Sequence, residues 1–385
     1  MKKPQPINRR FAALFACSVL AVLFVSSCKN DLQDIKPDRK PTSTGTTPTL
    51  PNTVYTGNTD GTFYALDALS GALKWKLEAG GNFSYSAPAV SNGVVYAGNT
   101  NNSMYAMDAA SGKLVWTFAT GNSIESSPAV YGGTVYFGSD DHSFYAVNIK
   151  DGSLKWKYQT GYNLSSSPAI FDGVVFFGSD DNNLYALDAA TGSVKWQYNA
   201  GSIFNASSPV IDNGVIYIGT RAGDLLAVDV MSGQLKWKYS NPDQISFEQN
   251  TAAVVNGVVY ISGWYNVSNQ KPGSVYALNA TDGSLKWESL DGLGFTRGPA
   301  VSNGKLYVAA DDGNLYALDA TNGNVLWKSV VLPNGSGITV ANSTVYTAGG
   351  GSFYTFDLAG NKLWQYAQPT SFSDSKPYIT DVNGY

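Results

Sequence analysis

Residues 185–196 read Tyr-Ala-Leu-Asp-Ala-Ala-Thr-Gly-Ser-Val-Lys-Trp, and this stretch decides the fold. Apolar residues lead into Asp188, whose carboxylate is suited to accept the backbone N–H groups of a tight turn. Gly192 adopts the positive φ that such a turn needs more readily than any other residue. A second apolar and polar alternation then runs to Trp196. The stretch therefore predicts strand, turn, strand.

The same pattern occurs eight times. Each copy ends in a tryptophan, and successive tryptophans are 41, 40, 40, 41, 50, 40 and 37 residues apart. Upstream of each copy lies an apolar run, such as residues 173–178, and before that a segment such as residues 166–170. Each unit thus holds four short strands, here lettered A to D in order. Four-stranded repeats of about 40 residues are typical of β-propeller blades. The eight tryptophans are Trp75, Trp116, Trp156, Trp196, Trp237, Trp287, Trp327 and Trp364.

The two ends of the repeat region complement each other. The first unit starts at residues 52–55 with its B strand, and residues 375–380 match the A strand of the second unit, residues 86–91. We therefore predict an all-β, eight-bladed β-propeller of four-stranded antiparallel blades over residues 51–385, in which the C-terminal strand completes the first blade. Such closure removes the open end that a linear array of sheets would expose.

Residues 1–27 have the pattern of a lipoprotein signal peptide. Four cations precede an apolar run, residues 11–25, that is too short for a comfortable membrane span. Residues 25–28, Val-Ser-Ser-Cys, resemble the bacterial lipobox, in which the cysteine takes a diacylglycerol. We predict lipidation of Cys28 and a flexible tether over residues 28–50. The alternative is an ordinary signal that leaves Cys28 free. The residues after Cys28 favour the outer membrane, with its periplasmic and cell-surface sides both open.

The composition excludes several classes of function. Only 14% of the residues are charged, the net charge is −4, and the repeat region has no block of Lys and Arg, which argues against nucleic acid as a partner. Cys17 would leave with the signal and Cys28 would carry the lipid, so the mature body has no thiol for a disulfide, a nucleophile or a metal. His142 is the single histidine, which excludes a histidine-rich metal site.

The repeat resembles the tryptophan-docking repeat of the pyrroloquinoline-quinone (PQQ) propeller superfamily over residues 52–385. That superfamily includes quinoprotein dehydrogenases, sensor ectodomains and the BamB lipoproteins of the outer-membrane β-barrel assembly machinery. The resemblance implies structural tryptophans that pack between blades and donate their ring N–H to a backbone acceptor. For a dehydrogenase it also implies bound PQQ and Ca²⁺ and a disulfide of adjacent cysteines, which this chain lacks. We therefore expect no enzyme, no metal site and neither PQQ nor Ca²⁺.

Acidic residues allow two interpretations. Asp140-Asp141, Asp180-Asp181 and Asp311-Asp312 recur at one repeat position, where they either cap a hairpin turn or bind calcium; their low ligand density favours capping. Glu125 and Glu248 lie in loops between blades. They form either a polar rim or a pair of carboxylates for glycoside hydrolysis, and we expect the rim.

Positions that depart from the repeat carry the candidate binding site. The spacing from the B-strand aromatic to its C-strand counterpart is nine residues in six blades but sixteen from Tyr260 to Tyr276. The D–A loop before this blade is also the longest, and both irregular loops fall on one face of the predicted ring. Because Trp and Tyr are enriched in binding hot spots, we predict partner binding there. In the alternative, Trp264 folds back on its own blade. The predicted residues are Trp264, Tyr265, Ile245, Phe247, Glu248 and Arg297.

An apolar residue also precedes the A strand in most units. These residues either plug the central channel and start the inner strands, as we expect, or line a binding funnel together with Tyr85, Tyr162 and Arg297. They are Phe83, Ile124, Leu164, Phe204, Phe247, Phe295 and Phe372.

The leading hypothesis is a non-catalytic outer-membrane lipoprotein whose propeller is a scaffold for protein partners, with the β-barrel assembly machinery as the partner that the resemblance suggests. One alternative is a surface lipoprotein that binds glycans or another small ligand. A PQQ-dependent dehydrogenase is the less favoured alternative. The sequence names neither the partner nor the side of the membrane.

Overall fold

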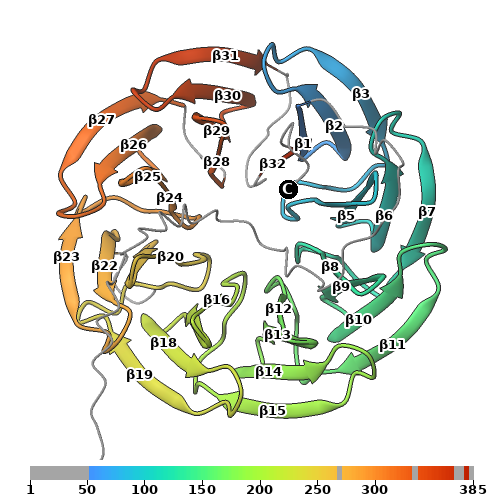
Figure 1. Cartoon of the computed structure of the whole chain (residues 1–385), viewed down its shortest axis with the longest axis horizontal. Helices are drawn as coiled ribbons and strands as arrows, with labels where there is room; N and C mark the ends of the chain where they lie inside the picture. The colour runs from blue at the N-terminus through green and yellow to red at the C-terminus, as the bar shows by residue number, and fades with distance from the viewer. Residues whose placement is uncertain (1–51, 267–270, 332–336, 368–376, 381–385) are drawn as a thin grey trace, which may run out of the picture.

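The computed structural model describes residues 52–266, 271–331, 337–367 and 377–380. Within these residues the chain forms thirty-two strands and no helix, so this part of the chain has no helical segment able to cross a membrane. The strands form eight antiparallel sheets of four, arranged radially around a central axis (Figure 1). The predicted eight-bladed propeller is confirmed. The predicted signal segment, Cys28 and the tether lie outside the described residues.

Each blade runs from an inner A strand to an outer D strand (Figure 1). The A strands of blades 1 to 8 are β32 (Tyr378–Thr380), β4 (Ala89–Ser91), β8 (Ala129–Tyr131), β12 (Ala169–Phe171), β16 (Val210–Asp212), β20 (Ala253–Val255), β24 (Ala300–Ser302) and β28 (Thr339–Ala341). The B strands are β1 (Thr53–Gly57), β5 (Val94–Asn99), β9 (Thr134–Ser139), β13 (Val174–Gly178), β17 (Val215–Gly219), β21 (Val258–Ser262), β25 (Lys305–Ala309) and β29 (Thr344–Gly349). The C strands are β2 (Thr62–Asp67), β6 (Ser103–Asp108), β10 (Ser143–Asn148), β14 (Asn183–Asp188), β18 (Asp224–Asp229), β22 (Val275–Asn279), β26 (Asn314–Asp319) and β30 (Ser352–Asp357). The D strands are β3 (Leu73–Glu78), β7 (Leu114–Ala119), β11 (Leu154–Gln159), β15 (Val194–Asn199), β19 (Leu235–Ser240), β23 (Leu285–Ser289), β27 (Val325–Val330) and β31 (Lys362–Ala367).

The repeated motif forms the C and D strands and the turn between them. The carboxylate of Asp188 accepts the backbone N–H of Ala190 at 3.1 Å and of Thr191 at 3.0 Å. Gly192 has φ +74°, and its N–H reaches the Asp188 carbonyl at 2.8 Å. The side chain and the glycine thus close the turn, and the chain leaves it as the outer strand that carries Trp196.

Each motif tryptophan docks on the next blade. Its indole N–H donates to a carbonyl in the C–D turn of that blade at 2.9 to 3.2 Å. The ring also lies against the turn glycine: a Cβ added to Gly192 would come within 2.7 Å of the Trp156 ring. The glycine is therefore needed twice, for its φ and for the space that the neighbouring indole fills.

Apolar side chains of the B and C strands form the core between adjacent blades. Phe144 of blade 3 and Phe177 of blade 4 stack with ring centroids 4.0 Å apart, and both rings are fully buried. Burial of one such ring contributes about 1.5–3 kcal/mol relative to exposure. The D strands, in contrast, alternate exposed and half-buried residues because they form the outer edge of each sheet.

The last strand closes the ring. β32 pairs with β1 in the register Val54 to Ile379, so blade 1 is made of strands from both ends of the repeat region. Blade 8 then docks on blade 1 through Trp364. The predicted completion of the first blade by the C-terminal strand is confirmed.

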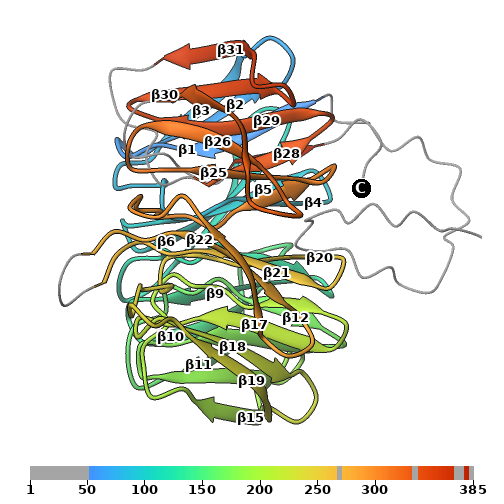
Figure 2. The ribbon, with the colours of Figure 1, turned by 90° about the vertical axis from the view of Figure 1, so that its left-hand side faces the viewer.

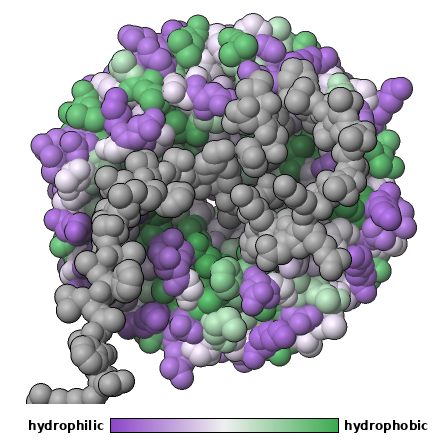
Figure 3. Space-filling view, viewed as in Figure 1, coloured by the Kyte–Doolittle hydropathy of each residue, from purple (hydrophilic) through white to green (hydrophobic). Residues whose placement is uncertain are grey.

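The meander divides the connections between the two faces of the ring. A–B and C–D turns lie on one face, and B–C and D–A loops on the other. Figure 2 shows the ring edge-on, with the β21–β22 connection projecting from the B–C face. On the opposite face, shown in Figure 3, hydrophilic and hydrophobic residues are interspersed around the perimeter. The irregular loops of the sequence therefore lie together on one face.

Candidate functional site

The insertion in blade 6 extends the hairpin of β21 and β22 beyond the body of the ring. Gly263 N–H donates to the Ser274 carbonyl and Gly273 N–H to the Trp264 carbonyl, both at 2.8 Å. An isolated bridge between Tyr265 and Pro272 continues the same pairing. The insertion is thus an ordered hairpin over its described residues, and this ladder fixes the backbone of Trp264.

The long D–A loop before blade 6 pairs with this hairpin. Ile245 and Asn266 form an antiparallel bridge, and the backbone N–H of Trp264 donates to the Ser246 carbonyl at 3.1 Å. Lys271 and Asp243 add an exposed ion pair at 2.5 Å. The two irregular loops therefore form one unit, which we call the loop platform: residues 241–250, 263–266 and 271–274.

Two of the predicted contact residues in the platform have buried side chains. Ile245 is 1% exposed and Phe247 is fully buried. Phe247 packs against Tyr276, with ring centroids 5.6 Å apart, and against Gly219 of blade 5. These two side chains therefore anchor the loop to the core, and partner binding by them stays a prediction.

Glu248 is also buried, so its expected place in a polar rim is wrong. Its carboxylate lies 3.7 Å from Arg221 Nε, with 6% of the Glu248 side chain exposed. The pKa of Glu248 is raised, because the effect of burial exceeds the lowering by the Arg221 charge and by a hydrogen bond from Asn205. The negative charge of Asp180 also raises the pKa of Glu248. Partner binding by Glu248 stays a prediction.

The acidic pairs divide into two roles. Asp181 caps its turn, since it accepts Asn183 N–H at 3.0 Å and the Tyr185 hydroxyl at 2.7 Å. Asp180 instead accepts the backbone N–H of Asn205, in the next D–A loop, at 2.8 Å. Burial raises the pKa of Asp180. The prediction of turn capping is therefore wrong for this first member. Sequence reasoning missed its role.

The six described members of the predicted apolar ring pack in the core between blades, so they neither plug the channel nor line a funnel. Phe83, Ile124, Leu164, Phe204, Phe247 and Phe295 are all at most 1% exposed and belong to the core clusters between blades. These side chains pack closely on a glycine in the B strand of the preceding blade. For example, a Cβ added to Gly178 would clash with the side chain of Phe204. Tyr85 and Tyr162 are exposed, and Tyr162 stacks on His142 with ring centroids 5.4 Å apart. Phe372 lies outside the described residues.

Trp264 and Tyr265 are the members of the predicted set that reach a pocket. Both are half-buried, and their rings meet edge to face with centroids 4.0 Å apart. Trp264 packs across the boundary to blade 7: a Cβ on Gly294 would lie 3.3 Å from its Cδ1 atom. The side chain thus does not fold back into the core of its own blade.

Arg297 lies in the same D–A loop as Gly294. It is half-buried, and its carbonyl accepts the Ser262 hydroxyl at 3.1 Å. Arg297 lines neither of the two pockets beside the platform. The structure therefore does not bring it together with Trp264 and Tyr265 in one pocket.

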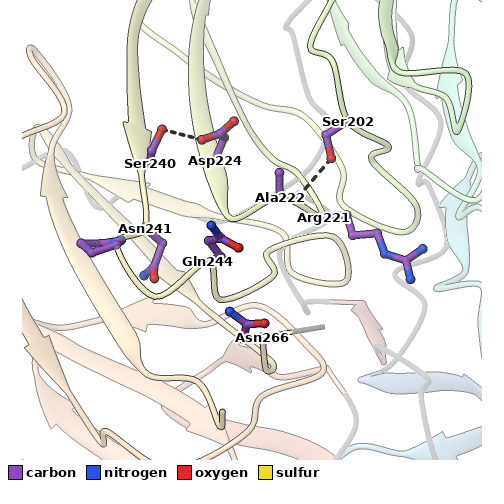
Figure 4. Close-up of a pocket in the computed structure, with 9 residues that line it drawn as sticks. Ser202, Arg221, Ala222, Asp224, Ser240, Asn241, Gln244 and Asn266 are labelled. Carbon is purple, nitrogen blue, oxygen red and sulfur yellow. Dashed lines mark hydrogen bonds between the residues drawn. The ribbon is translucent and has the colours of Figure 1, made fainter. Parts of the chain in front are cut away.

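A polar pocket of about 560 Å³ lies on the blade 5 side of the platform (Figure 4). Gln244 and Asn266 face the same space, while Arg221 points away from them. Ser240 donates to Asp224 at 2.6 Å, which fixes one wall. The lining residues are Ser202, Arg221, Ala222, Asp224, Ser240, Asn241, Pro242, Gln244 and Asn266.

A second pocket of about 540 Å³ lies on the blade 7 side, beside Trp264. It joins three segments: the blade 6 insertion, the D–A loop to blade 7 and the B–C loop of blade 7. Its charged lining residues are both acidic. The lining residues are Trp264, Tyr265, Pro272, Gly292, Leu293, Gly294, Asp311 and Asp312.

The charged residues beside the platform are poorly suited to a calcium-dependent quinone. They contain no group of three or more His, Cys, Asp or Glu side chains that could hold a metal ion. The charge of Arg221 acts on both Asp180 and Glu248 and offsets the negative charge that a divalent ion needs. In the pocket beside Trp264, Asp311 and Asp312 would repel the carboxylates of PQQ.

Comparison with known proteins gives one family. The family model described as outer membrane protein assembly factor BamB matches residues 29–162, 110–270 and 271–379. No curated protein matches the sequence significantly.

Several solved structures share the fold. BamB from Moraxella catarrhalis has a TM-score of 0.66 and 19% identity, over 76% of this chain and 89% of that chain. A europium-containing methanol dehydrogenase has a TM-score of 0.63 and 15% identity, over 78% and 80%. Quinohemoprotein alcohol dehydrogenase from Comamonas testosteroni has the same TM-score and identity, over 78% and 69%. The propeller is thus common to a protein of outer-membrane assembly and to enzymes.

Proposed function

The chain belongs to the family described as outer membrane protein assembly factor BamB, and on this premise we propose that it is a non-catalytic scaffold for protein partners at the outer membrane. The family model matches the chain from residue 29 to residue 379, which includes nearly all of the propeller. A propeller by itself specifies no activity, so the proposal depends on what the loops offer.

The observation that carries the proposal is the loop platform. Seven of the eight B–C connections are short turns, whereas the blade 6 connection is a hairpin that the preceding D–A loop braces. The bracing presents Trp264 and Tyr265 half-exposed on an ordered backbone. Aromatic residues held in this way lose little conformational freedom on binding and are typical of protein interfaces.

We propose that Cys28 anchors the protein through a covalent lipid and that residues 28–50 tether the propeller to the membrane. The lipobox-like residues 25–28 support this proposal. Protease treatment of intact cells distinguishes the two sides of the outer membrane: digestion of the propeller places it on the cell surface, and protection places it in the periplasm.

The test of the scaffold is a pull-down of the full chain from detergent-solubilised membranes. We expect the wild-type protein to recover components of the β-barrel assembly machinery and the variant with Trp264→Ala and Tyr265→Ala to recover far less. Recovery of the machinery in equal amounts by both proteins would show that the platform is not the contact surface. Recovery of glycan-utilisation proteins in its place would contradict the assembly role.

The polar pocket favours one second candidate, a surface lipoprotein that binds glycans. Asn241, Gln244 and Asn266 line this pocket, and residues with side-chain amides suit the hydroxyl groups of sugars. Calorimetry with a panel of oligosaccharides tests this candidate. Binding that Gln244→Ala abolishes would support it over the protein scaffold.

We propose that the protein needs neither PQQ nor Ca²⁺. The poor fit of Arg221, Asp311 and Asp312 to these groups supports this proposal. After incubation with PQQ and Ca²⁺, gel filtration should separate the protein from the quinone. Quinone that coelutes in a one-to-one ratio would contradict the proposal.

A further inference from the structure

The pocket beside Trp264 combines an aromatic wall with an acidic wall. Trp264 and Tyr265 form one side, with rings edge to face. Asp311 and Asp312, from the B–C loop of blade 7, form the other. Leu293 lies between them in the D–A loop. The pocket therefore spans the boundary between blades 6 and 7, and no cation lines it among the described residues.

The two aspartates, Asp311 and Asp312, differ in the groups that they contact. Asp312 is held in its turn, because it accepts Asn314 N–H at 3.1 Å and the Tyr316 hydroxyl at 2.6 Å. The charge of Lys328, whose Nζ lies 5.9 Å from the Tyr316 ring centroid, also acts on Asp312. Asp312 thus already has polar partners within its own blade.

Asp311 faces the D–A loop. Its backbone N–H donates to the Gly294 carbonyl at 3.0 Å. A Cβ on Gly294 would collide with Asp311 Oδ2 and lie 3.3 Å from Trp264 Cδ1. The carboxylate oxygen and the indole edge therefore both lie next to the same glycine. This leaves an indole and a carboxylate side by side at the pocket.

We propose that this pocket binds a basic side chain, arginine or lysine, from a protein partner. A cation is attracted to the face of Trp or Tyr and to a carboxylate at the same time. The two acidic side chains are the only charged residues in the described lining of the pocket, so a basic group matches it in charge. The inference deepens the proposed scaffold function and rests on it for the nature of the partner.

The titration of Asp311 is consistent with this assignment. Partial desolvation and the neighbouring Asp312 charge raise the pKa of Asp311. In the free protein the negative charge of ionised Asp311 is therefore poorly stabilised, and a bound cation would stabilise it. Because the cation binds the ionised form, binding weakens as the pH falls through the pKa of Asp311, which burial raises above its usual value of 3.8.

The test uses Trp264, the one tryptophan that is not a docking tryptophan, as a local probe. The full protein labelled with 5-fluorotryptophan gives fluorine NMR signals from its tryptophans, and Trp264→Phe identifies the signal of Trp264. The probes are acetyl-Gly-Arg-Gly-amide and the matched Gly-Gln-Gly peptide. We expect the arginine peptide to shift the Trp264 signal saturably and the glutamine peptide to leave it in place. Added salt should weaken the binding.

Asp311→Asn should weaken binding of the arginine peptide by about tenfold, since one charged partner is lost. Asp172→Asn is the matched control. It removes one exposed carboxylate from an A–B turn on the opposite face, where Asn tolerates the φ of +48°. This control should bind the peptide like the wild-type protein.

Three results would overturn the inference: no shift at peptide concentrations of tens of millimolar, equal shifts with both peptides, or equal affinity of Asp311→Asn. A shift caused by oligosaccharides but not by the arginine peptide would assign the pocket to glycans. The pull-down separates the two proposals. Capture of the assembly machinery without peptide binding refutes this inference alone, whereas peptide binding without such capture leaves the pocket in place and refutes the assembly role.

Discussion

Trp364 donates its indole N–H to the carbonyl of Ala68 at 3.1 Å, across 296 residues of sequence. This bond has the same geometry as the seven that join consecutive blades. The junction between blades 8 and 1 is therefore built like every other junction, although the residues that form it are far apart in the chain.

Trp364→Phe should lower the free energy of unfolding by about as much as Trp156→Phe. Each variant removes one N–H donor, worth about 1 kcal/mol net, and some of the ring area. Urea denaturation of both proteins measures the two losses. A loss confined to Trp156→Phe would mean that the junction of blades 8 and 1 is open in solution.

Gly192→Ala should destabilise the protein more than Gly173→Ala. Both glycines have positive φ, +74° and +71°, which costs alanine about 1–2 kcal/mol. A Cβ on Gly192 also meets the Trp156 ring at 2.7 Å, whereas a Cβ on Gly173 meets nothing within 4 Å. Overpacking adds about 1–3 kcal/mol. Thermal unfolding measures the difference, and equal midpoints would show that the indole moves aside without cost.

Replacing Trp264 and Tyr265 with Ala should weaken partner capture by about thirtyfold, because loss of a binding hot spot costs about 2 kcal/mol or more. The thermal midpoint should change little, since both side chains are only half-buried and the eight docking tryptophans stay in place. Surface plasmon resonance and calorimetry measure the two quantities. A large drop in the midpoint with capture intact would identify the pair as packing.

Glu248→Gln should stabilise the protein at neutral pH and change little at pH 4. Burial raises the pKa of Glu248 above its unfolded value of 4.5, so the folded state binds more protons between these two values. The free energy of unfolding therefore falls as the pH rises through this window. Glutamine removes the buried charge and should flatten that part of the profile. Glu78→Gln, at an exposed carboxylate, controls for the loss of one charge. A wild-type profile in the Glu248 variant would contradict this assignment.

Cys28→Ala should move the protein from the membrane fraction to the soluble fraction, because the variant lacks the thiol that we propose as the lipid attachment site. Fractionation with high-salt washes and immunoblotting checks this. Cys17→Ala, within the predicted signal, is the matched control and should leave the protein in the membrane. Retention of the Cys28 variant after the washes would contradict the anchor.

The ring was predictable because one interaction repeats. Since Trp156 and its seven equivalents recur at nearly constant spacing, each blade could be counted and the missing inner strand assigned to the C-terminus. The burial of Phe247 also had a signal, because this residue occupies the repeat position of Phe204, which is buried in the same way. Its place in an irregular loop concealed that signal.

Other parts of the site had no signal in the sequence. Asp180 and Asp181 have identical side chains, and only the direction of the backbone makes one a turn cap and the other a partner of Asn205. The bridge between Ile245 and Asn266 joins two loops whose residues carry no shared pattern. Pairing of this kind depends on how the two blades sit, which periodicity does not encode.

The sharing of blade 1 between β1 and β32 sets an order in time. During synthesis from the N-terminus, each of blades 2 to 8 is complete once its four consecutive strands have been made. Blade 1 is complete only when β32 has been made and can pair with β1. Until then the inner edge of β1 is an unpaired strand edge, of the kind that pairs with other chains. This edge therefore stays unpaired longest during synthesis, and a stop codon anywhere before β32 leaves β1 without its partner.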